Sequence, residues 1–305
     1  MDVLVPGGTG FIGRHLCRTL LERGHAVTAC SRDPDAGDVP AGVILKKADI
    51  TNYQSIQGLI AEHEAVVNLV ALSPMLKPRD GDAMHERVHL TGTRNIVRGM
   101  IDSDCERLVQ ISAMHANPDG PTAYLRAKGK AEGVVQSSDI RWSIIRPTVV
   151  FGPGDEFIEI TRKLTTPYVT ALPGGGKARF QPIAVEDLCT VLATGLSDVT
   201  HTDGVYEIGG PAVYSLAGIT RAIYAAQDKP VRIVPIPMLL TRLGLTIMDP
   251  IPRLPFGTDQ YRALFVDAVP DSNDVSAFGL TTEDLRTLEA DLTDRFSDNP
   301  MRNAP

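Results

Sequence analysis

The segment Val3-Leu4-Val5-Pro6-Gly7-Gly8-Thr9-Gly10-Phe11-Ile12-Gly13 joins an apolar, β-branched run to a glycine-rich turn and the start of a helical pattern. Its glycines have the spacing G-x-x-G-x-x-G. Such a turn needs glycine because the backbone must adopt unusual torsions, approach a pyrophosphate closely and let the helix pack on the strand. The helix N-terminus then offers free N–H groups to phosphate. The order of strand, turn and helix favours a dinucleotide site over a glycine-rich turn without a ligand.

The first half of the chain continues this alternation of strands and helices. The predicted strands are Asp2–Pro6, Ala26–Ser31, Val43–Lys47, Ala65–Val70, Arg107–Ile111 and Trp142–Arg146, and the predicted helices include Ile12–Arg23, Tyr53–Glu62, Ala83–Ile101 and Ala123–Gln136. Near-continuous apolar strands separated by helices predict an α/β fold with a Rossmann-type, doubly wound parallel sheet. We expect residues 1–150 to form a dinucleotide-binding domain and residues 151–305 a smaller C-terminal α/β lobe that binds substrate.

Composition excludes several classes of protein. The 305 residues include 30 Lys plus Arg and 37 Asp plus Glu, a net charge of −7, which argues against a general nucleic-acid binder. The four cysteines form no close pair, which suits a reducing compartment, and we expect a cytoplasmic protein without a signal peptide. Charged residues and prolines interrupt the apolar stretch 231–251, so it is a poor transmembrane candidate. We expect this stretch to lie in the core or at a subunit interface, with a face for an isoprenoid, a quinone or a membrane edge as a weaker alternative.

The end of the second predicted strand bears on the choice of cofactor. An NAD site usually places a carboxylate there, whereas this chain has Cys30-Ser31-Arg32. A guanidinium can bind a 2′-phosphate through paired, charge-assisted hydrogen bonds. Ser31 and Arg32 therefore predict a preference for NADP(H). NAD(H) stays as the alternative, because Arg32 could be a solvated surface residue and Asp33 could accept from the ribose.

Tyr124 and Lys128 are the candidate catalytic pair. Their spacing places both side chains on one face of the predicted helix Ala123–Gln136. A free phenol has a pKa near 10, and we expect the neighbouring ammonium, with the nicotinamide cation in the oxidised complex, to stabilise the phenolate and lower the pKa of Tyr124. The phenol would then exchange a proton with a carbonyl or an alcohol while the nicotinamide exchanges a hydride. Lys128 would also hold the nicotinamide ribose.

The chain resembles the extended and atypical short-chain dehydrogenase/reductases, which include epimerase/dehydratase-like proteins. Within this superfamily it is most similar to the NADPH-binding accessory subunits of respiratory complex I and their free-standing prokaryotic relatives. The residues behind the resemblance are Gly7–Gly13, Asp49-Ile50, Asn68-Leu69-Val70-Ala71, Ile111-Ser112-Ala113, Arg146–Asp155, Arg179–Ile183, Val185-Glu186-Asp187 and Tyr206–Pro211, with a fainter echo at Thr258-Asp259-Gln260.

The resemblance implies where the cofactor binds. The cofactor-binding residues would be Gly7, Thr9, Gly10, Phe11, Ile12, Gly13, Ser31, Arg32, Asp49, Ile50, Leu69, Val70, Ala71, Ser112, Tyr124, Lys128, Pro147 and Val149. Relatives usually carry a Ser or Thr that polarises the substrate carbonyl where this chain has Ala113, and a lost donor costs ~10²–10³ in rate. Ser112, one residue earlier, is the weaker candidate for that role.

These residues lead to three hypotheses about function. The first is an NADP(H)-dependent oxidoreductase with Tyr124 as the acid/base and Lys128 as its activator. The second, favoured by Ala113, is a non-catalytic NADPH-binding structural or redox-sensing module of a larger, respiratory assembly. The third is a nucleotide-sugar epimerase or dehydratase. The substrate stays unnamed, with an apolar or quinone-like compound as one option, and the expected partners are further copies of this chain or a membrane complex bound peripherally.

Two further motifs are open to more than one interpretation. His85-Glu86-Arg87-Val88-His89 matches the zinc motif H-E-x-x-H, with Gly92 in place for a longer version, but Asn95 stands where a third histidine is required. We therefore expect no metal. Pro173-Gly174-Gly175-Gly176-Lys177 is either a lid over the site or a structural β-turn, and Arg179, Phe180 and Gln181 are candidates to face a substrate.

Overall fold

A parallel sheet forms the centre of the molecule. The computed structural model describes residues 1–34, 39–75, 78, 80–239, 241 and 266–296. Within these residues, seven parallel strands are arranged in the order β11-β6-β5-β4-β1-β2-β3. They are β1 (Asp2–Pro6), β2 (Ala26–Ser31), β3 (Ile44–Lys47), β4 (Ala65–Asn68), β5 (Arg107–Ile111), β6 (Arg141–Pro147) and β11 (Gly204–Ile208). The chain reverses its direction of winding between β1 and β4, and such sheets bind ligands at that switch point.

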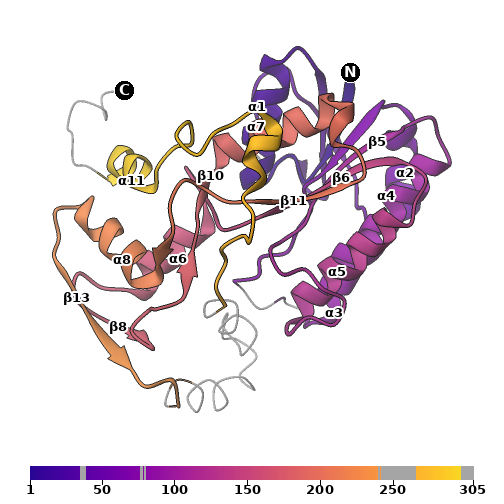
Figure 1. The fold of residues 1–305 in the computed structure, drawn as a ribbon. Coiled ribbons are helices and arrows are strands. Elements are labelled where there is room, and N and C mark those ends of the chain that lie inside the picture. Colours follow the sequence, from indigo (N-terminus) through magenta and orange to yellow (C-terminus); the bar gives the residue numbers. More distant parts are fainter. Residues whose placement is uncertain (35–38, 76–77, 79, 240, 242–265, 297–305) are drawn as a thin grey trace.

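Helices cover both faces of the sheet (Figure 1). One face carries α1 (Phe11–Glu22) and α7 (Val185–Ser197), and the other carries α2 (Tyr53–Ala61), α4 (Gly92–Ile101) and α5 (Ala123–Gln136). Alternate residues of β1 reach opposite layers: Val3 and Val5 belong to the cluster around α1, and Leu4 to the one around α2 and α4. Burial on both faces explains why β1 is apolar at consecutive positions.

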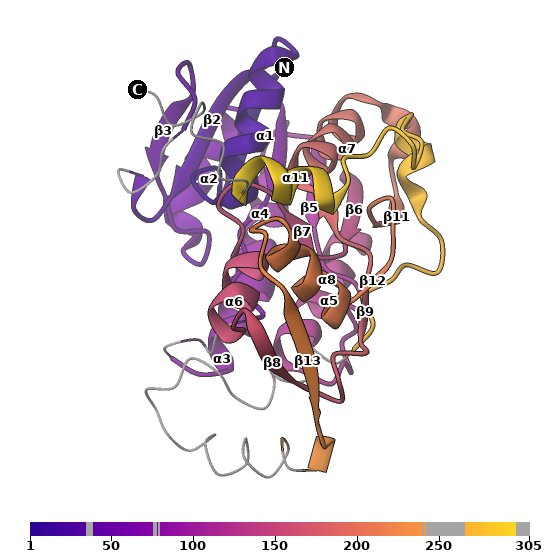
Figure 2. The same ribbon diagram turned by 90° about the vertical axis from the view of Figure 1, so that its left-hand side faces the viewer.

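A smaller lobe stands beside the carboxyl ends of the strands (Figure 2). It contains α6 (Glu156–Leu164), α8 (Leu216–Ala225), α11 (Leu288–Phe296) and the parallel pair β8 (Tyr168–Pro173) and β13 (Val231–Ile236). The short pairs β7 (Val150–Phe151) with β10 (Ile183–Ala184), and β9 (Arg179–Phe180) with β12 (Tyr214–Ser215), connect it to the sheet. Its own apolar cluster includes Phe157, Ile158, Phe180, Leu216 and Leu292.

The Rossmann-type fold predicted from the sequence is confirmed, and most predicted elements agree within one or two residues. The predicted helix Ala83–Ile101 is instead divided into α3 (Ala83–His85), a π-helical turn Glu86–Thr91 and α4. The expected boundary at residue 150 is not an edge of the sheet, because β11 and α7 belong to the C-terminal half yet complete the large sheet and its cover. The division into two domains stays a prediction.

The apolar stretch 231–251 is described only in part. Its first residues form β13, which is partly exposed, although Ile233 packs against the apolar cluster of the small lobe. The predicted role in the core or at an interface stays a prediction. Residues 240 and 242–251, and the weaker similarity at Thr258–Gln260, lie outside the described residues.

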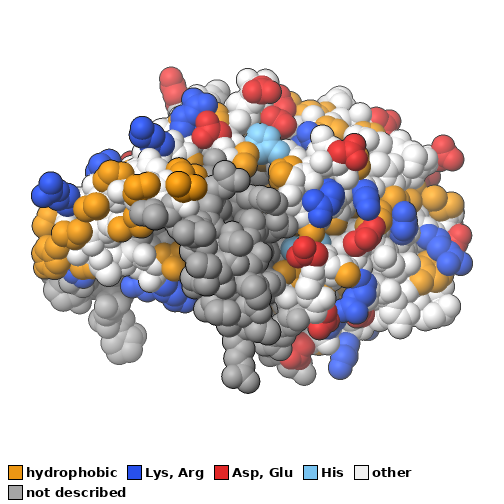
Figure 3. Space-filling model, turned by 90° about the horizontal axis from the view of Figure 1, so that it is seen from below, with side chains coloured by type: hydrophobic (Ala, Val, Ile, Leu, Met, Phe, Trp, Pro, Cys, Tyr) orange, Lys and Arg blue, Asp and Glu red, His pale blue; other side chains and the backbone are white. Residues whose placement is uncertain are grey.

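Exposed apolar side chains gather on the small lobe around β8 and β13 (Figure 3), among them Leu164, Tyr168, Val169, Val234, Met238 and Leu239. In the described part of the chain, no helix combines the length and apolar character needed to cross a membrane.

Candidate active site

The glycine turn between β1 and α1 forms one end of the candidate site. Gly7 has a φ of 82° and its N–H donates to the Cys30 carbonyl at 2.9 Å, which ties the turn to β2. A Cβ at Gly13 would lie 2.3 Å from the Gly7 oxygen, so only glycine lets α1 begin this close to the turn. A Cβ at Gly10 would lie 3.3 Å from the same oxygen. Gly10 is the N-cap of α1, and no side chain caps this helix, so its first turn is suited to an anion.

A cleft of about 580 Å³ runs from this turn along the carboxyl ends of β4, β5 and β6. This is the size range of ligand pockets in proteins. Of the residues predicted to bind the cofactor, twelve line it: Gly7, Gly10, Phe11, Ile12, Gly13, Leu69, Ala71, Ser112, Tyr124, Lys128, Pro147 and Val149. The small lobe supplies part of the opposite wall, with Gly154, Glu156 and Phe157. Most of the predicted cofactor residues therefore share one cavity.

The other six predicted cofactor residues, Thr9, Ser31, Arg32, Asp49, Ile50 and Val70, are not part of the described lining. Arg32 is exposed directly after β2. The Asp49 carboxylate accepts from the N–H and hydroxyl of Thr51 at 2.9 and 2.8 Å. The Ile50 carbonyl accepts from the Asn95 side chain at 2.8 Å. Thr9 belongs to the glycine turn itself, and the other five end or follow β2, β3 and β4 at the same edge of the sheet. The role of all six in binding a cofactor stays a prediction.

Tyr124 and Lys128 lie one turn apart on α5, and both line the cleft. Thr122 caps this helix by accepting from the Leu125 N–H at 3.2 Å, which fixes where the turn bearing Tyr124 begins. The Lys128 side chain is only 2% exposed, and its ammonium donates to the Ile111 carbonyl at the end of β5, at 3.0 Å. Burial lowers the pKa of Lys128 to about 8, against an opposing effect from Glu132. Helix α5 thus positions both side chains, and the end of β5 fixes the Lys128 ammonium.

The Lys128 ammonium by itself does not lower the pKa of Tyr124 as expected, and the effect of a nicotinamide cation stays a prediction. Burial raises the pKa of the phenol above its ordinary value instead, because an apolar setting disfavours the phenolate. The lysine ammonium is directed to the Ile111 carbonyl. Tyr124 is therefore a protonated phenol at neutral pH.

Two histidines pack against Tyr124, a contact that the sequence did not reveal. The rings of His85 and His89 are stacked with their centroids 5.7 Å apart. Both meet the Tyr124 ring edge-on, at 5.7 and 5.3 Å. Burial, with smaller effects from Lys128 and His85, holds the pKa of His89 well below its ordinary value, so this ring is neutral. The sequence shows the spacing of the two histidines, which matches H-E-x-x-H, but it contains no signal for their contact with Tyr124.

The other residues of that motif point elsewhere. Glu86 is exposed and pairs with Lys130 at 3.0 Å, while Asn95 donates to the Ile50 carbonyl. Among the described residues, no group of three or more metal-binding side chains comes together. The expected absence of metal stays a prediction.

Ser112 and Ala113 follow β5 beside Tyr124. Ser112 is 5% exposed, and its hydroxyl has no hydrogen-bond partner in the described structure, although the residue lines the cleft. Ala113 also lines the cleft and has no polar atom in its side chain. A buried, unsatisfied hydroxyl is costly, so the Ser112 hydroxyl is the polar group here that a bound molecule would satisfy.

Arg179, Phe180 and Gln181 are not among the described residues that line the cleft, and their expected substrate-facing role stays a prediction. Arg179 pairs with Asp267 at 2.8 Å, Phe180 is buried in the small lobe, and Gln181 donates to the Gly210 carbonyl at 2.7 Å. Gly174, Gly175 and Gly176 have positive φ and form a turn closed by hydrogen bonds to Leu172 and Pro173. Of the two interpretations of this loop, the structural turn fits these contacts.

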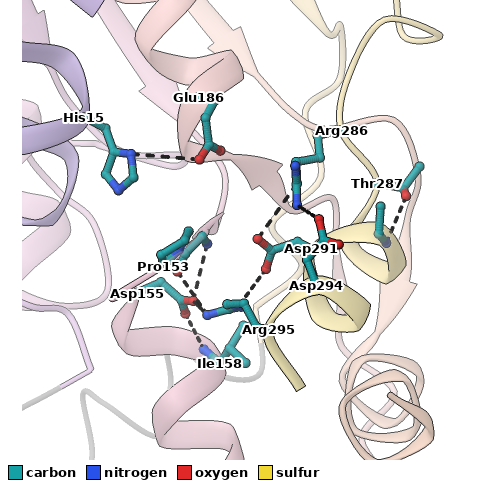
Figure 4. Close-up of polar contacts among 12 residues, drawn as sticks. His15, Pro153, Asp155, Ile158, Glu186, Arg286, Thr287, Asp291, Asp294 and Arg295 are labelled. Atoms are coloured by element: carbon teal, nitrogen blue, oxygen red, sulfur yellow. Dashed lines mark hydrogen bonds and ion pairs between the residues drawn. The ribbon is translucent and has the colours of Figure 1, made fainter. Parts of the chain in front are cut away.

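A buried ion-pair network anchors the wall of the cleft (Figure 4). Asp155 caps α6 by accepting from the Ile158 N–H at 2.6 Å, and its side chain is fully buried. Arg295 of α11 pairs with Asp155 at 2.8 Å and with Asp291 at 2.7 Å, and it donates to the Gly152 carbonyl at 3.0 Å. Arg14 of α1 donates to the Pro153 carbonyl at 2.9 Å. The loop that leads into Glu156 and Phe157 is therefore held from both sides.

Residues 7–171 match the sequence profile of the NAD(P)H-binding family. This chain belongs to that family. Among curated proteins, it is 26% identical to "NADH dehydrogenase [ubiquinone] 1 alpha subcomplex subunit 9, mitochondrial" of Arabidopsis thaliana, over 88% of this chain and 71% of the relative. It is 24% identical to "NADH-ubiquinone oxidoreductase 40 kDa subunit, mitochondrial" of Neurospora crassa, over 99% and 81%.

The similarity extends to enzymes of the same superfamily. The chain is 22% identical to a UDP-glucose 4-epimerase of Vibrio cholerae, over 79% of this chain and 80% of the relative. The solved structure of a Thermus thermophilus UDP-glucose 4-epimerase in complex with NAD superposes with a TM-score of 0.73 at 20% identity, covering all of both chains. The predicted relationship to extended short-chain dehydrogenase/reductases and to complex I subunits is thus confirmed.

Proposed function

We propose that this protein is an oxidoreductase that uses a nicotinamide cofactor to reduce a carbonyl group, with Tyr124 as the proton donor. The observation that carries the proposal is that Tyr124 and Lys128 share one cleft with the Gly7–Gly13 turn. When bound, the nicotinamide would supply or accept the hydride. Gly7, Gly10 and Gly13 would hold the pyrophosphate, and Lys128 and Ser112 would lie nearer the reacting end.

At neutral pH the phenol of Tyr124 carries the proton that reduction of a carbonyl group requires. The raised pKa of Tyr124 keeps its proton on the phenol until a developing alkoxide takes it. The Lys128 ammonium, with a pKa of about 8, is charged at pH 7 and would stabilise the phenolate that this transfer leaves behind. The Ser112 hydroxyl would donate to the same substrate oxygen.

We further propose NADP(H) as the preferred cofactor. The support is the exposed guanidinium of Arg32 directly after β2, where an NAD site usually has a carboxylate. NAD(H) is the alternative, and the cofactor titration described in the Discussion separates the two.

The test of the proposed activity is single-turnover oxidation of NADPH with a panel of aldehydes, ketones and quinones. Tyr124→Phe should lower the rate constant by at least about 100-fold, within the range for loss of a general acid. The affinity for NADPH should stay within about twofold, because the cofactor is held mainly by other residues. Unchanged oxidation in the Tyr124→Phe variant would contradict the role of Tyr124.

One observation supports a second candidate, a module that holds the dinucleotide without turnover. Ala113 presents no donor to the cleft at the position where relatives usually have Ser or Thr. Such a module would fit the similarity to subunits of a respiratory assembly, with peripheral association as the proposed mode of attachment. Dinucleotide that stays bound through purification, together with no oxidation across the panel, would favour this candidate.

A further inference from the structure

Five large apolar or proline side chains contribute to the lining of the cleft. Leu72, Pro74 and Met75 follow β4, Met114 follows β5, and Phe157 belongs to α6. From this lining we infer that the substrate is an uncharged carbonyl compound with a long apolar body. The inference rests on the proposed function for the reaction, but the shape and chemistry of this binding site are argued separately from it.

The charges around the cleft disfavour the main competing class, the nucleotide sugars. A diphosphate needs cations or several N–H donors, and Arg is the usual choice. Among the described lining residues, Lys128 is the only Lys or Arg, and it is bound to the Ile111 carbonyl at the Tyr124 end. The carboxylate of Glu156 also lines the cleft, where it accepts from the Ser73 hydroxyl beside Leu72 and Pro74, and it would repel a diphosphate.

The polar groups of the cleft are concentrated where one oxygen would react. Tyr124, Ser112 and His85 lie together after β5 and on the neighbouring helices, whereas Leu72, Pro74, Met75, Met114 and Phe157 present apolar surface, with Ser73 and Glu156 paired to each other among them. Burying an apolar body there removes no hydrogen bonds from the protein, while burying several hydroxyls would leave them without partners. Met75 and Met114 are unbranched and adaptable, which suits alkyl chains of varied shape.

The experiment compares a homologous series of 2-alkanones of increasing chain length with UDP-glucose, on the protein saturated with NADPH. Binding is measured by quenching of NADPH fluorescence and by thermal shift, and NADPH oxidation is recorded on the same samples. We expect affinity to rise roughly three- to fourfold for each added methylene until the cleft is filled. UDP-glucose should not displace the longest ketone.

A matched pair of variants locates the site. Leu72→Lys places an ammonium on the apolar wall, whereas Leu164→Lys makes the same change at a position on α6 that is 55% exposed and is not among the lining residues. Leu72→Lys should weaken the longest ketone by at least about tenfold, equivalent to two lost methylenes. Leu164→Lys should leave its affinity unchanged.

The outcomes distinguish this inference from the proposed function. A chain-length dependence of affinity without NADPH oxidation would support the apolar site and contradict the oxidoreductase. A flat series, equal behaviour of the two lysine variants, or tighter binding of UDP-glucose than of the ketones would overturn the inference, whether or not NADPH is oxidised.

Discussion

Gly10 and Gly13 both belong to the G-x-x-G-x-x-G motif, but they have different roles in the structure. A Cβ at Gly13 meets backbone at 2.3 Å, whereas one at Gly10 has its nearest contact at 3.3 Å and an ordinary φ of −78°. We expect Gly10→Val to fold but to lose at least about tenfold in NADPH affinity, since the branched side chain occupies the space for the pyrophosphate. Fluorescence titration and urea unfolding measure the two effects. Equal NADPH affinity in wild type and variant would show that the turn does not bind the cofactor.

Arg32 is the residue on which the cofactor preference depends. Loss of a charge-assisted hydrogen bond costs ~1.5–3 kcal/mol, or about 10- to 100-fold in affinity. Arg32→Ala should weaken NADPH by that factor and leave NADH almost unchanged, because only NADPH carries the 2′-phosphate. Arg18→Ala, on the exposed side of α1, is the control. A similar loss for both cofactors would mean that Arg32 does not contact the phosphate.

At the scale of single elements, α11 is attached to the rest of the protein through buried charges. Arg295→Met would leave the buried carboxylate of Asp155 without its ion-pair partner and Asp291 with only the longer contact to Arg286, and breaking such a buried pair costs about 3–5 kcal/mol. The exposed pair of Lys130 with Glu86 provides the matched control, and Lys130→Met should cost less than about 1 kcal/mol. Urea unfolding measures both changes. A loss for Arg295→Met no larger than that of the control would show that the network does not hold the helix in place.

The π-helical turn Glu86–Thr91 is a second element with a local effect on the site. It joins α3 to α4 and lies where His85 and His89 meet the ring of Tyr124. Single π-turns inside helices are frequent at functional sites. Helical periodicity predicted one continuous helix here, because sequence patterns do not report a wider turn that is stabilised by packing against α5.

At the scale of the whole molecule, the buried His89 makes stability depend on pH. Its pKa is well below 6.5 in the folded state, so the unfolded chain binds a proton that the folded chain does not. Stability is therefore retained above about pH 6.5 and lost as the pH falls, by up to about 1.4 kcal/mol per pH unit from this residue. His89→Asn should reduce the difference in unfolding free energy between pH 7 and pH 5.5, whereas His115→Asn, at an exposed position, should not. An unchanged difference in the His89 variant would contradict the assignment.

The sequence by itself determined the features that depend on neighbouring residues. The apolar run and glycine spacing of residues 3–13 fix a strand, a tight turn and a helix. The spacing of Tyr124 and Lys128 places them on one helical face, because helical geometry requires no knowledge of the remaining chain. Alternation of apolar strands and helices was sufficient for the parallel, doubly wound sheet.

Only the tertiary structure decided the environment of those residues. Burial raises the pKa of Tyr124 and lowers that of Lys128. The Lys128 ammonium donates a hydrogen bond to the Ile111 carbonyl, a contact that the spacing of the two residues does not indicate. The addition of β11 to the large sheet and the attachment of Arg295 to Asp155 join segments that are distant along the chain. Desolvation and long-range ion pairs depend on which surfaces meet in the folded chain, and local sequence patterns do not encode that information.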